Sequence, residues 1–335
     1  MAINTRLSIN EYREGILAGD RVVLAKAITL VESSLPEDQA LASRLLTELM
    51  PGTGNSVRIG VTGAPGVGKS TFIEALGKFL TANEKKVAIL TIDPSSQITG
   101  GSILGDKTRM ARLSRDPLAF IRPSSSGSIL GGVAGRTREA MLLCEAAGFE
   151  VIIIETVGVG QSEVMVRGMV DFFLLLMLAG AGDELQGIKK GIMEMADAVV
   201  ITKADGENLA RATEAQADFQ HAMHLLPNQP SGWIPKVITS SAVEQKGIAE
   251  TWAIVEQYCQ KVRASNHFTR TRQQQHVTWF IDHFRQRLLT DYLNYPEVSA
   301  LIDVLAEEVK RSSLSPYEAA EQLLAAYHRS VKKMH

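Results

Sequence analysis

Cysteine is scarce in this sequence, with Cys144 and Cys259 the only two among 335 residues. Two thiols in a chain of this size argue against a disulfide scaffold and fit a reducing compartment. Long apolar runs are also absent: the longest, 172–179, is far shorter than the about 20 residues that a membrane-spanning helix needs. The first ten residues have no apolar core of signal-peptide length. We therefore expect a cytoplasmic protein with no membrane partner.

An excess of charge of one sign is lacking as well. The chain has 35 Lys and Arg against 37 Asp and Glu, which gives a formal net charge of −2. Proteins that hold nucleic acid usually present a broad basic field, so this balance predicts no nucleic-acid partner. Hydrophobic residues make up 45% of the chain, which is enough for a buried globular core.

Short apolar runs alternate with helical patterns through the middle of the chain. Continuous apolar character is typical of strands buried on both faces of a parallel sheet, and the alternation with helices predicts a doubly wound α/β fold. We expect an N-terminal helical segment at 1–50, a nucleotide-binding domain at 51–265 and a C-terminal helical arm at 266–335, with helices starting at Pro36, Pro296 and Pro316. The predicted strands are Val57–Thr62, Val87–Ile92, Val151–Ile154, Phe172–Leu178, Ala198–Thr202 and Pro235–Thr239.

A glycine-rich motif follows the first predicted strand. It satisfies G-x-x-x-x-G-K-[ST] and precedes a predicted helix, which is the setting of a P-loop. Glycines let backbone N–H groups turn toward phosphate oxygens, while the lysine binds the β- and γ-phosphates and the serine binds Mg²⁺. The expected nucleotide-binding residues are Gly63, Ala64, Pro65, Gly66, Val67, Gly68, Lys69, Ser70 and Thr71.

Two further predicted strands end in carboxylates, Asp93 and Glu155. Burying an unpaired acid after an apolar run is costly, so we expect both to lie near the Mg²⁺ at the carboxyl edge of the sheet. Gly158 is expected to donate its N–H to the γ-phosphate. Either Gln161 or Glu163 is near enough in sequence to orient the attacking water, and spacing does not choose between them.

The motif Thr202-Lys-Ala-Asp205 predicts which nucleotide base the site binds. Asp205 is able to accept hydrogen bonds from N1–H and the exocyclic amine of guanine, a donor pair that adenine lacks. Lys203 is expected to lie along the purine face. One strand later, Ser240, Ser241 and Ala242 place a backbone N–H where it would contact guanine O6, so GTP is favoured over ATP.

Several longer segments resemble the methylmalonyl-CoA mutase-associated GTPases, once called arginine/ornithine transport kinases. The resemblance runs from about residue 20 to the C-terminus, and it is carried by the P-loop, by Asp93-Pro-Ser-Ser and by three longer segments: 99–110, 155–163 and 182–191. It implies a homodimeric GTPase of the signal-recognition-particle class, joined through its C-terminal arm. Such a protein gates cofactor delivery to an adenosylcobalamin-dependent acyl-CoA mutase and protects that mutase.

The resemblance also implies residue roles. The Mg²⁺ ligands would be Ser70, Asp93, Asp106 and Glu155. The catalytic set would be Lys69, Asp106, Glu155 and Lys189. A switch loop that couples the nucleotide state to the mutase would contain Asp183, Gln186 and Lys189. From composition alone, a helix N-terminus with solvated charges is the favoured interpretation of that segment, although its glycines would permit a mobile loop.

Alternatives remain at this stage. An ATP-dependent kinase linked to basic amino acid transport would need an acceptor pocket, and a metallochaperone GTPase would need clustered His or Cys, whereas His221 and His224 are better explained as surface residues. None of the seven histidines has the D-x-H-x-x-G setting of a cobalamin-binding enzyme. An apolar stripe in the arm is either core or dimer interface, formed by Trp279, Phe280, Phe284, Leu288 and Tyr292. No arginine finger is obvious, which predicts slow basal turnover; the candidates are Arg109, Arg136 and Arg138.

Overall fold

The structure is a computed structural model that describes residues 6–93, 110–125, 132–156, 162–179, 190–227 and 229–332. The chain forms two compact units, Met1–Gln275 and His276–His335, and each is described by itself. Helix α13 (His267–Leu293) begins in the first unit and continues into the second. Among the described residues, no helix combines the length and the apolar character that crossing a membrane requires.

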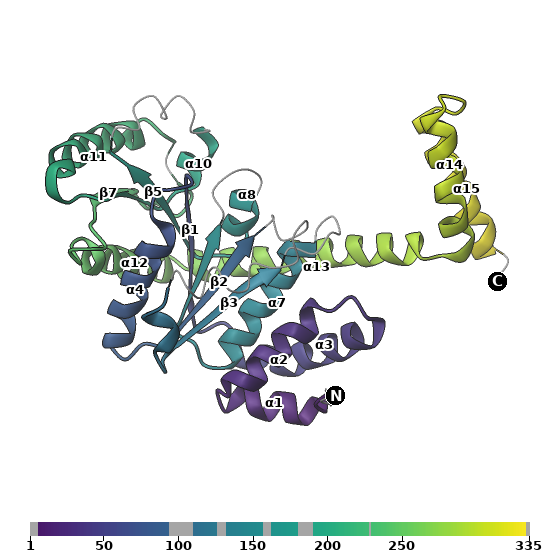
Figure 1. The fold of residues 1–335 in the computed structure, drawn as a ribbon, viewed down its shortest axis with the longest axis horizontal. Coiled ribbons are helices and arrows are strands. Elements are labelled where there is room, and N and C mark those ends of the chain that lie inside the picture. The colour runs from purple at the N-terminus through teal and green to yellow at the C-terminus, as the bar shows by residue number, and fades with distance from the viewer. Residues whose placement is uncertain are drawn as a thin grey trace. The chain divides into compact units, whose positions relative to one another are not determined.

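The described part of the first unit contains one sheet of seven parallel strands in the order β3-β2-β4-β1-β5-β6-β7 (Figure 1). This confirms the predicted parallel α/β fold. The strands are β1 (Val57–Gly63), β2 (Val87–Asp93), β3 (Ala119–Ser125), β4 (Val151–Thr156), β5 (Phe172–Leu178), β6 (Ala198–Thr202) and β7 (Lys236–Thr239). Six of them match predicted runs to within two residues at each end, and β3 was not predicted.

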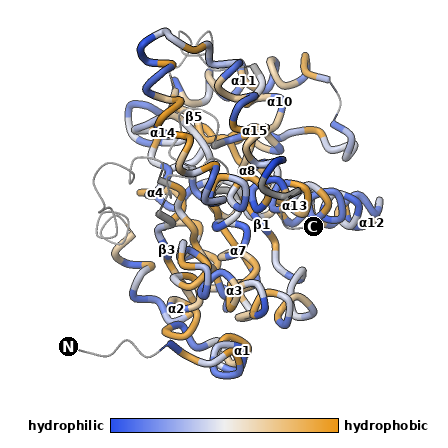
Figure 2. Tube along the Cα trace, turned by 90° about the vertical axis from the view of Figure 1, so that its right-hand side faces the viewer, coloured by the Kyte–Doolittle hydropathy of each residue, from blue (hydrophilic) through white to orange (hydrophobic). Residues whose placement is uncertain are grey.

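Helices cover both faces of the sheet. Side chains of α4 and α12 form one core cluster with strand residues such as Ile59, Ile153 and Leu174. On the other face, α10 and α11 form a second cluster with Leu175, Val199 and neighbouring residues, while α7 and α8 contact β4. Apolar residues accordingly concentrate along the strands (Figure 2). These helices are α4 (Lys69–Ala82), α7 (Gly132–Ala146), α8 (Ser162–Arg167), α10 (Lys190–Met195), α11 (Leu209–His224) and α12 (Ile248–Ala264).

The N-terminal helices pack beside α7 (Figure 1). They are α1 (Ile9–Leu17), α2 (Arg21–Glu32) and α3 (Pro36–Leu49). Ser8 caps α1 in a capping box with Glu11, Asp20 caps α2 by accepting two backbone N–H groups, and proline opens α3 as predicted. In the second unit, α14 (Pro296–Lys310) and α15 (Pro316–Lys332) also begin at prolines, and they pack on each other.

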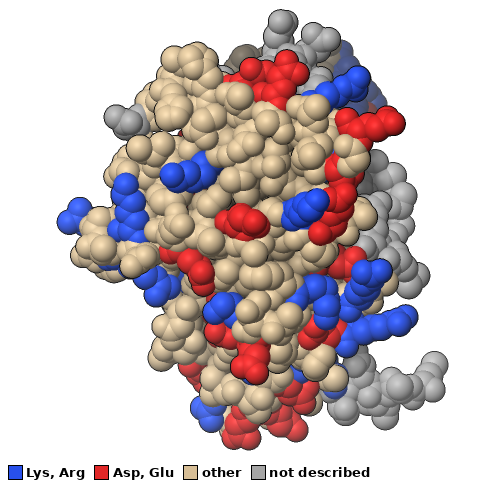
Figure 3. Space-filling view, turned by 90° about the vertical axis from the view of Figure 1, so that its left-hand side faces the viewer, with Lys and Arg blue, Asp and Glu red and all other residues tan. Residues whose placement is uncertain are grey.

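The surface shown in Figure 3 carries basic and acidic side chains in an interspersed pattern. This arrangement on that face agrees with the near-zero net charge of −2.

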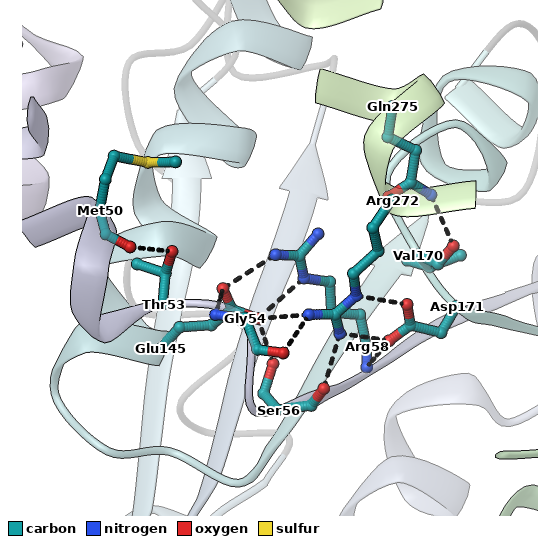
Figure 4. A network of polar contacts seen from close by, with 10 residues as sticks. All are labelled: Met50, Thr53, Gly54, Ser56, Arg58, Glu145, Val170, Asp171, Arg272 and Gln275. Atoms are coloured by element: carbon teal, nitrogen blue, oxygen red, sulfur yellow. Dashed lines mark hydrogen bonds and ion pairs between the residues drawn. The ribbon is translucent and has the colours of Figure 1, made fainter. Parts of the chain in front are cut away.

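A buried network of four charges joins β1, α7, the start of β5 and the first turns of α13 (Figure 4). Arg58 donates from Nε and Nη2 to the two carboxylate oxygens of Glu145, at 2.9 and 2.8 Å. Arg272 donates from Nε and Nη2 to the two carboxylate oxygens of Asp171, at 2.9 and 2.7 Å. Burial acts to raise the pKa of the Glu145 carboxyl, but the bonds and charge of Arg58, with help from the Ser56 hydroxyl, outweigh it and hold that pKa below its ordinary 4.5.

Candidate nucleotide-binding site

The P-loop connects β1 to α4, as the motif predicts. Helix α4 begins at Lys69, and the residue before it, Gly68, has a φ of +93° that favours glycine because it lacks a Cβ atom. The loop therefore turns directly into the helix N-terminus, where unsatisfied N–H groups and the helix dipole attract an anion. This is the geometry of a phosphate cradle.

Lys69 is almost completely buried beside this loop, with 9% of its surface exposed. Its ammonium group donates to the carbonyl oxygens of Gly63, at 2.8 Å, and Ala64, at 3.2 Å. Burial lowers the pKa of Lys69, and the negative charges of Glu155 and Glu163 act against that change. A cation is thus held at the loop with two acids close enough to stabilise it.

Glu155 lies next to the P-loop in the sheet. In the strand register it is paired with Val61 of β1 on one side and with Thr91 of β2 on the other. The carboxylate accepts a hydrogen bond from the Ser70 hydroxyl at 3.1 Å, and Glu155 is only 8% exposed. A hydroxyl and a buried carboxylate in contact form an all-oxygen donor set, which fits the ligand preference of Mg²⁺.

Asp93 is the last residue of β2, and β2 is the neighbour of β4 in the sheet. The structure therefore brings the ends of both predicted acid-bearing strands to the same edge as the P-loop. It describes the backbone of Asp93 and not its side chain.

The predicted base-binding segment lies against the P-loop. The Thr202 hydroxyl is 2.7 Å from the carbonyl oxygen of Val67 and 3.1 Å from that of Met177, so its one hydrogen is shared between the phosphate loop and the neighbouring strand β5. Lys203 has a φ of +55°, and its Cε atom lies 4.0 Å from where a Cβ on Gly68 would be. The stem of this lysine therefore runs over the P-loop.

The Asp205 carboxylate is held by the other predicted base-binding segment. The Ser241 hydroxyl donates to Oδ2 of Asp205 at 2.5 Å, and the same hydroxyl oxygen accepts the backbone N–H of Glu244 at 3.1 Å. Ser241 is fully buried, and the backbone carbonyl of Ser240 accepts the N–H of Ala204 at 3.0 Å. The structure thus joins residues 202–205 and 240–242 into one rim beside the P-loop.

Two hydrogen bonds and one charge effect were not anticipated from the sequence. The Ser241 hydroxyl donates to Asp205, the Thr202 hydroxyl donates to the carbonyl oxygen of Val67, and the charge of Glu163 acts to raise the pKa of Lys69. Serine and threonine beside an acid or a carbonyl are a weak signal, because these residues are common in loops. The charge of Arg136 lowers the pKa values of Glu32 and Glu139 against the effect of burial, and the finger roles considered for Arg136 and Arg138 stay predictions.

Seven predicted residues lie outside the described part of the chain, and their roles stay predictions. They are Asp106, Arg109, Gly158, Gln161, Asp183, Gln186 and Lys189.

The fold and the site define a P-loop nucleotide hydrolase. A parallel sheet presents a glycine-rich loop, a buried lysine, a serine–carboxylate pair and the rim formed by residues 202–205 and 240–242 at one edge.

Comparison with known proteins identifies the family. A model of the family described as methylmalonyl Co-A mutase-associated GTPase MeaB matches residues 24–297. The chain therefore belongs to this family, and it is a GTPase that hydrolyses GTP to GDP and phosphate.

Three relatives are similar in sequence over nearly the whole chain. A Mycobacterium tuberculosis protein named Probable GTPase Rv1496 is 50% identical over 317 residues, which cover 95% of this chain and 94% of the relative. The Escherichia coli protein named GTPase ArgK is 48% identical over 316 residues, 94% of each chain. The Mus musculus protein named Methylmalonic aciduria type A homolog, mitochondrial, is 44% identical over 329 residues, covering 95% of this chain and 79% of the relative.

A solved structure is similar as well. The crystal structure of a protein named LAO/AO transport system kinase is 40% identical, with a TM-score of 0.74, and the match covers 97% of this chain and 99% of that one.

Proposed function

We propose that this chain is a Mg²⁺-dependent GTPase that acts as a G-protein chaperone of an adenosylcobalamin-dependent acyl-CoA mutase of the methylmalonyl-CoA mutase type. In this role it gates cofactor loading and protects the mutase. The observation that most supports GTP as the nucleotide is the Asp205 carboxylate, which the Ser241 hydroxyl fixes beside the P-loop. The partner is supported by the description of the family to which the chain belongs.

Guanine selection is assigned to Asp205. Its carboxylate would accept from N1–H and the exocyclic amine of guanine. A nucleotide without this donor pair would leave the Asp205 carboxylate with the Ser241 hydroxyl and no donor from the base, which costs affinity. The Lys203 stem would cover one face of the base, and the Ala242 N–H would contact guanine O6.

Hydrolysis is assigned to the phosphate end of the site, at the P-loop. Lys69 would move from the carbonyl oxygens of Gly63 and Ala64 to the β- and γ-phosphates, while the loop's N–H groups surround the phosphate oxygens. Ser70 and Glu155, which already contact each other, would hold Mg²⁺ together with Asp93 and Asp106. The metal supplies charge neutralisation as the terminal phosphoryl group is transferred.

The partner would act through the segment that precedes α10 in sequence. We propose that Asp183, Gln186 and Lys189 couple the nucleotide state to the mutase, and that Gly158 contacts the γ-phosphate. Basal turnover would be slow and would rise when the mutase binds.

The arm, which we place at 266–335, would form the homodimer. On the part of α13 that belongs to the second unit, large apolar side chains recur every three or four residues and are exposed: Val277 by 50%, Phe280 by 70%, Phe284 by 58% and Leu288 by 52%. An exposed apolar stripe of this kind suits a symmetric interface. Light scattering should give the mass of a dimer, and Phe284→Asp should shift it to a monomer.

A cytoplasmic location is part of the same proposal. The two cysteines are free and buried, which supports a reducing compartment.

Turnover assays test the proposed partner. Purified protein with Mg²⁺ should hydrolyse GTP much faster than ATP, and an acyl-CoA mutase of this type should increase the GTP rate several-fold. Equal rates with and without the mutase would exclude the regulatory role.

A kinase linked to basic amino acid transport is the second candidate, since the similar crystal structure belongs to a protein named as a transport system kinase. Phosphate transfer from ATP to arginine, ornithine or a transport protein would favour it. Release of inorganic phosphate alone would favour the GTPase chaperone.

A further inference from the structure

The hydroxyl groups of two threonines join the P-loop strand to its neighbour in the sheet. Strands β1 and β4 run in parallel, and their last paired residues are Val61 and Glu155. One residue further along each strand stand Thr62 and Thr156, and the Thr156 hydroxyl donates to Oγ1 of Thr62 at 2.9 Å. Thr156 is the last residue of β4, and β1 ends one residue after Thr62. This hydrogen bond therefore lies at the end of the strand pair, where the P-loop begins.

Both threonines are buried, with 1% of each residue exposed. The body of β4 is apolar from Val151 to Ile154, so valine would serve at its last position if filling the sheet were the only requirement. A buried hydroxyl costs free energy unless it is hydrogen-bonded, and here the two hydroxyls are bonded to each other. The change from apolar to polar residues along β4 thus coincides with the end of the strand that lies beside the P-loop.

The last two side chains of β4 bond to partners on opposite faces of the sheet, because successive residues of a strand point to alternate faces. On one face, the Glu155 carboxylate accepts the hydroxyl of Ser70, in the first turn of α4, at 3.1 Å. On the other face, Thr156 is bonded to Thr62. The end of β4 is thus tied to the strand that enters the P-loop and to the helix that leaves it.

We propose that Thr62 and Thr156 are positioning residues for GTP hydrolysis, whose hydrogen bond sets the place of the β4 end relative to the P-loop. Through the backbone, this bond fixes where the Glu155 carboxylate stands relative to the Ser70 hydroxyl. The inference rests on the proposed function, in which Ser70 and Glu155 hold Mg²⁺. A displacement of about 1 Å in a group that must meet the reacting atoms can cost roughly a hundredfold in rate, so a bond outside the site can affect turnover. Both threonines act through Glu155 and the P-loop and not by contact with the nucleotide.

The test is Thr156→Val, which removes the hydroxyl and nearly keeps the shape. Two quantities are measured: kcat for GTP, and the gain in affinity from Mg²⁺, taken as the ratio of the dissociation constants of a non-hydrolysable GTP analogue in EDTA and in Mg²⁺. We expect the gain to fall about fivefold, as for the loss of one buried hydrogen bond, and kcat to fall about tenfold. Affinity in EDTA should change by less than about twofold, because the P-loop N–H groups that hold the phosphates remain. A gain and a kcat both within about twofold of wild type would overturn the proposal.

Two further variants show whether the hydrogen bond is responsible. Thr156→Ser keeps the hydroxyl, so its gain and kcat should stay close to wild type; losses as large as those of Thr156→Val would overturn the proposal. Thr62→Val should reproduce the losses of Thr156→Val, and the double variant should lose no more than either single one, because all three lack the same bond. Losses that multiply in the double variant would likewise overturn it.

The matched control is Thr81→Val. Thr81 is likewise buried, and its hydroxyl donates to Oδ2 of Asp116 at 2.8 Å, near the C-terminal end of α4 and away from the P-loop. This variant should lower the free energy of unfolding in urea and leave kcat and the gain from Mg²⁺ unchanged. If the control lowers kcat and the gain as much as Thr156→Val does, the effect is a general loss of stability, and the positioning role is overturned.

The double variant decides the matter if Thr156→Val does not fold. Replacing both threonines by valine leaves neither hydroxyl of the pair buried without the other, so the double variant is the one expected to fold best. An unchanged kcat and an unchanged gain from Mg²⁺ in this variant would overturn the proposal. Failure of the proposed metal site gives a different result, since wild-type protein would then gain no affinity from Mg²⁺.

Discussion

Replacing Arg272 by alanine should lower the free energy of unfolding of the first unit by more than any substitution of an exposed side chain does. The Arg272 side chain is 8% exposed, makes two hydrogen bonds to Asp171, and donates to the carbonyl oxygens of Gly54 and Ser56, both at 2.6 Å (Figure 4). Its guanidinium also stacks on the Phe268 ring, 4.4 Å from the centroid. Alanine removes all of these contacts at once.

The size of the loss in stability follows from the buried charge of Asp171, which remains after Arg272 is removed. Asp171 would keep the N–H of Arg58, at 2.8 Å, while its side chain stays 2% exposed. Removing one partner of a buried ion pair costs about 3–5 kcal/mol, because the other charge is left without compensation. For a unit of this size that corresponds to a fall in Tm of roughly 10 °C.

Urea unfolding followed by tryptophan fluorescence measures this cost. The control is Arg287→Ala on the same helix, where an exposed pair with Asp291 at 3.3 Å should contribute less than about 0.5 kcal/mol. Adding Asp171→Asn to Arg272→Ala should recover part of the loss, since the buried charge is then removed. A loss below about 1 kcal/mol for Arg272→Ala would refute the reasoning.

Three further predictions concern single hydrogen bonds or charges. Ser241→Ala frees the Asp205 carboxylate, so GTP affinity should fall about tenfold and that of inosine triphosphate, which lacks the exocyclic amine, should fall less; calorimetric titration measures both, and equal losses would contradict the assigned role. Thr202→Val removes the donor to Val67 and should lower the free energy of unfolding by about 1 kcal/mol and weaken nucleotide binding, and unchanged values of both would contradict it. The pKa of Glu145 is held below its ordinary 4.5, so its stabilising contribution is complete above that pH and is lost as the pH falls through the lower folded value; urea unfolding across this range should show the loss, and a chain that gains stability on acidification would contradict it.

Most strands could be predicted because each is an apolar run buried on both faces of a parallel sheet. Strand β3 was not predicted because Arg122 and Pro123 interrupt its apolar pattern. Proline cannot donate to a ladder and is tolerated at a sheet edge, which is where β3 lies, paired with β2 alone among the described strands. Arg122 donates from Nη2 to Glu32 of α2 at 2.5 Å, a contact across 90 residues that no local pattern reveals.

The P-loop between β1 and α4, and the position of residues 202–205 at the end of a strand, could be predicted because each motif is contiguous in sequence. The base-binding role of residues 202–205 stays a prediction. The contacts that orient these motifs could not be predicted, since Ser241 reaches Asp205 across 36 residues and Thr202 reaches Val67 across 135. The same holds for the Arg272 network, in which the sequence separation reaches 218 residues. Such contacts depend on how the elements pack, and a single sequence does not show this.

The central claim is that the loop between β1 and α4 binds the phosphates of a guanine nucleotide with Mg²⁺. Titration of a fluorescent GTP analogue into purified protein, with Mg²⁺ present, tests it most directly. Saturable binding that unlabelled GTP displaces, that ATP does not displace, and that Lys69→Ala weakens by at least about tenfold is the expected result. Binding that is absent, or that ATP displaces as well as GTP does, would contradict the account.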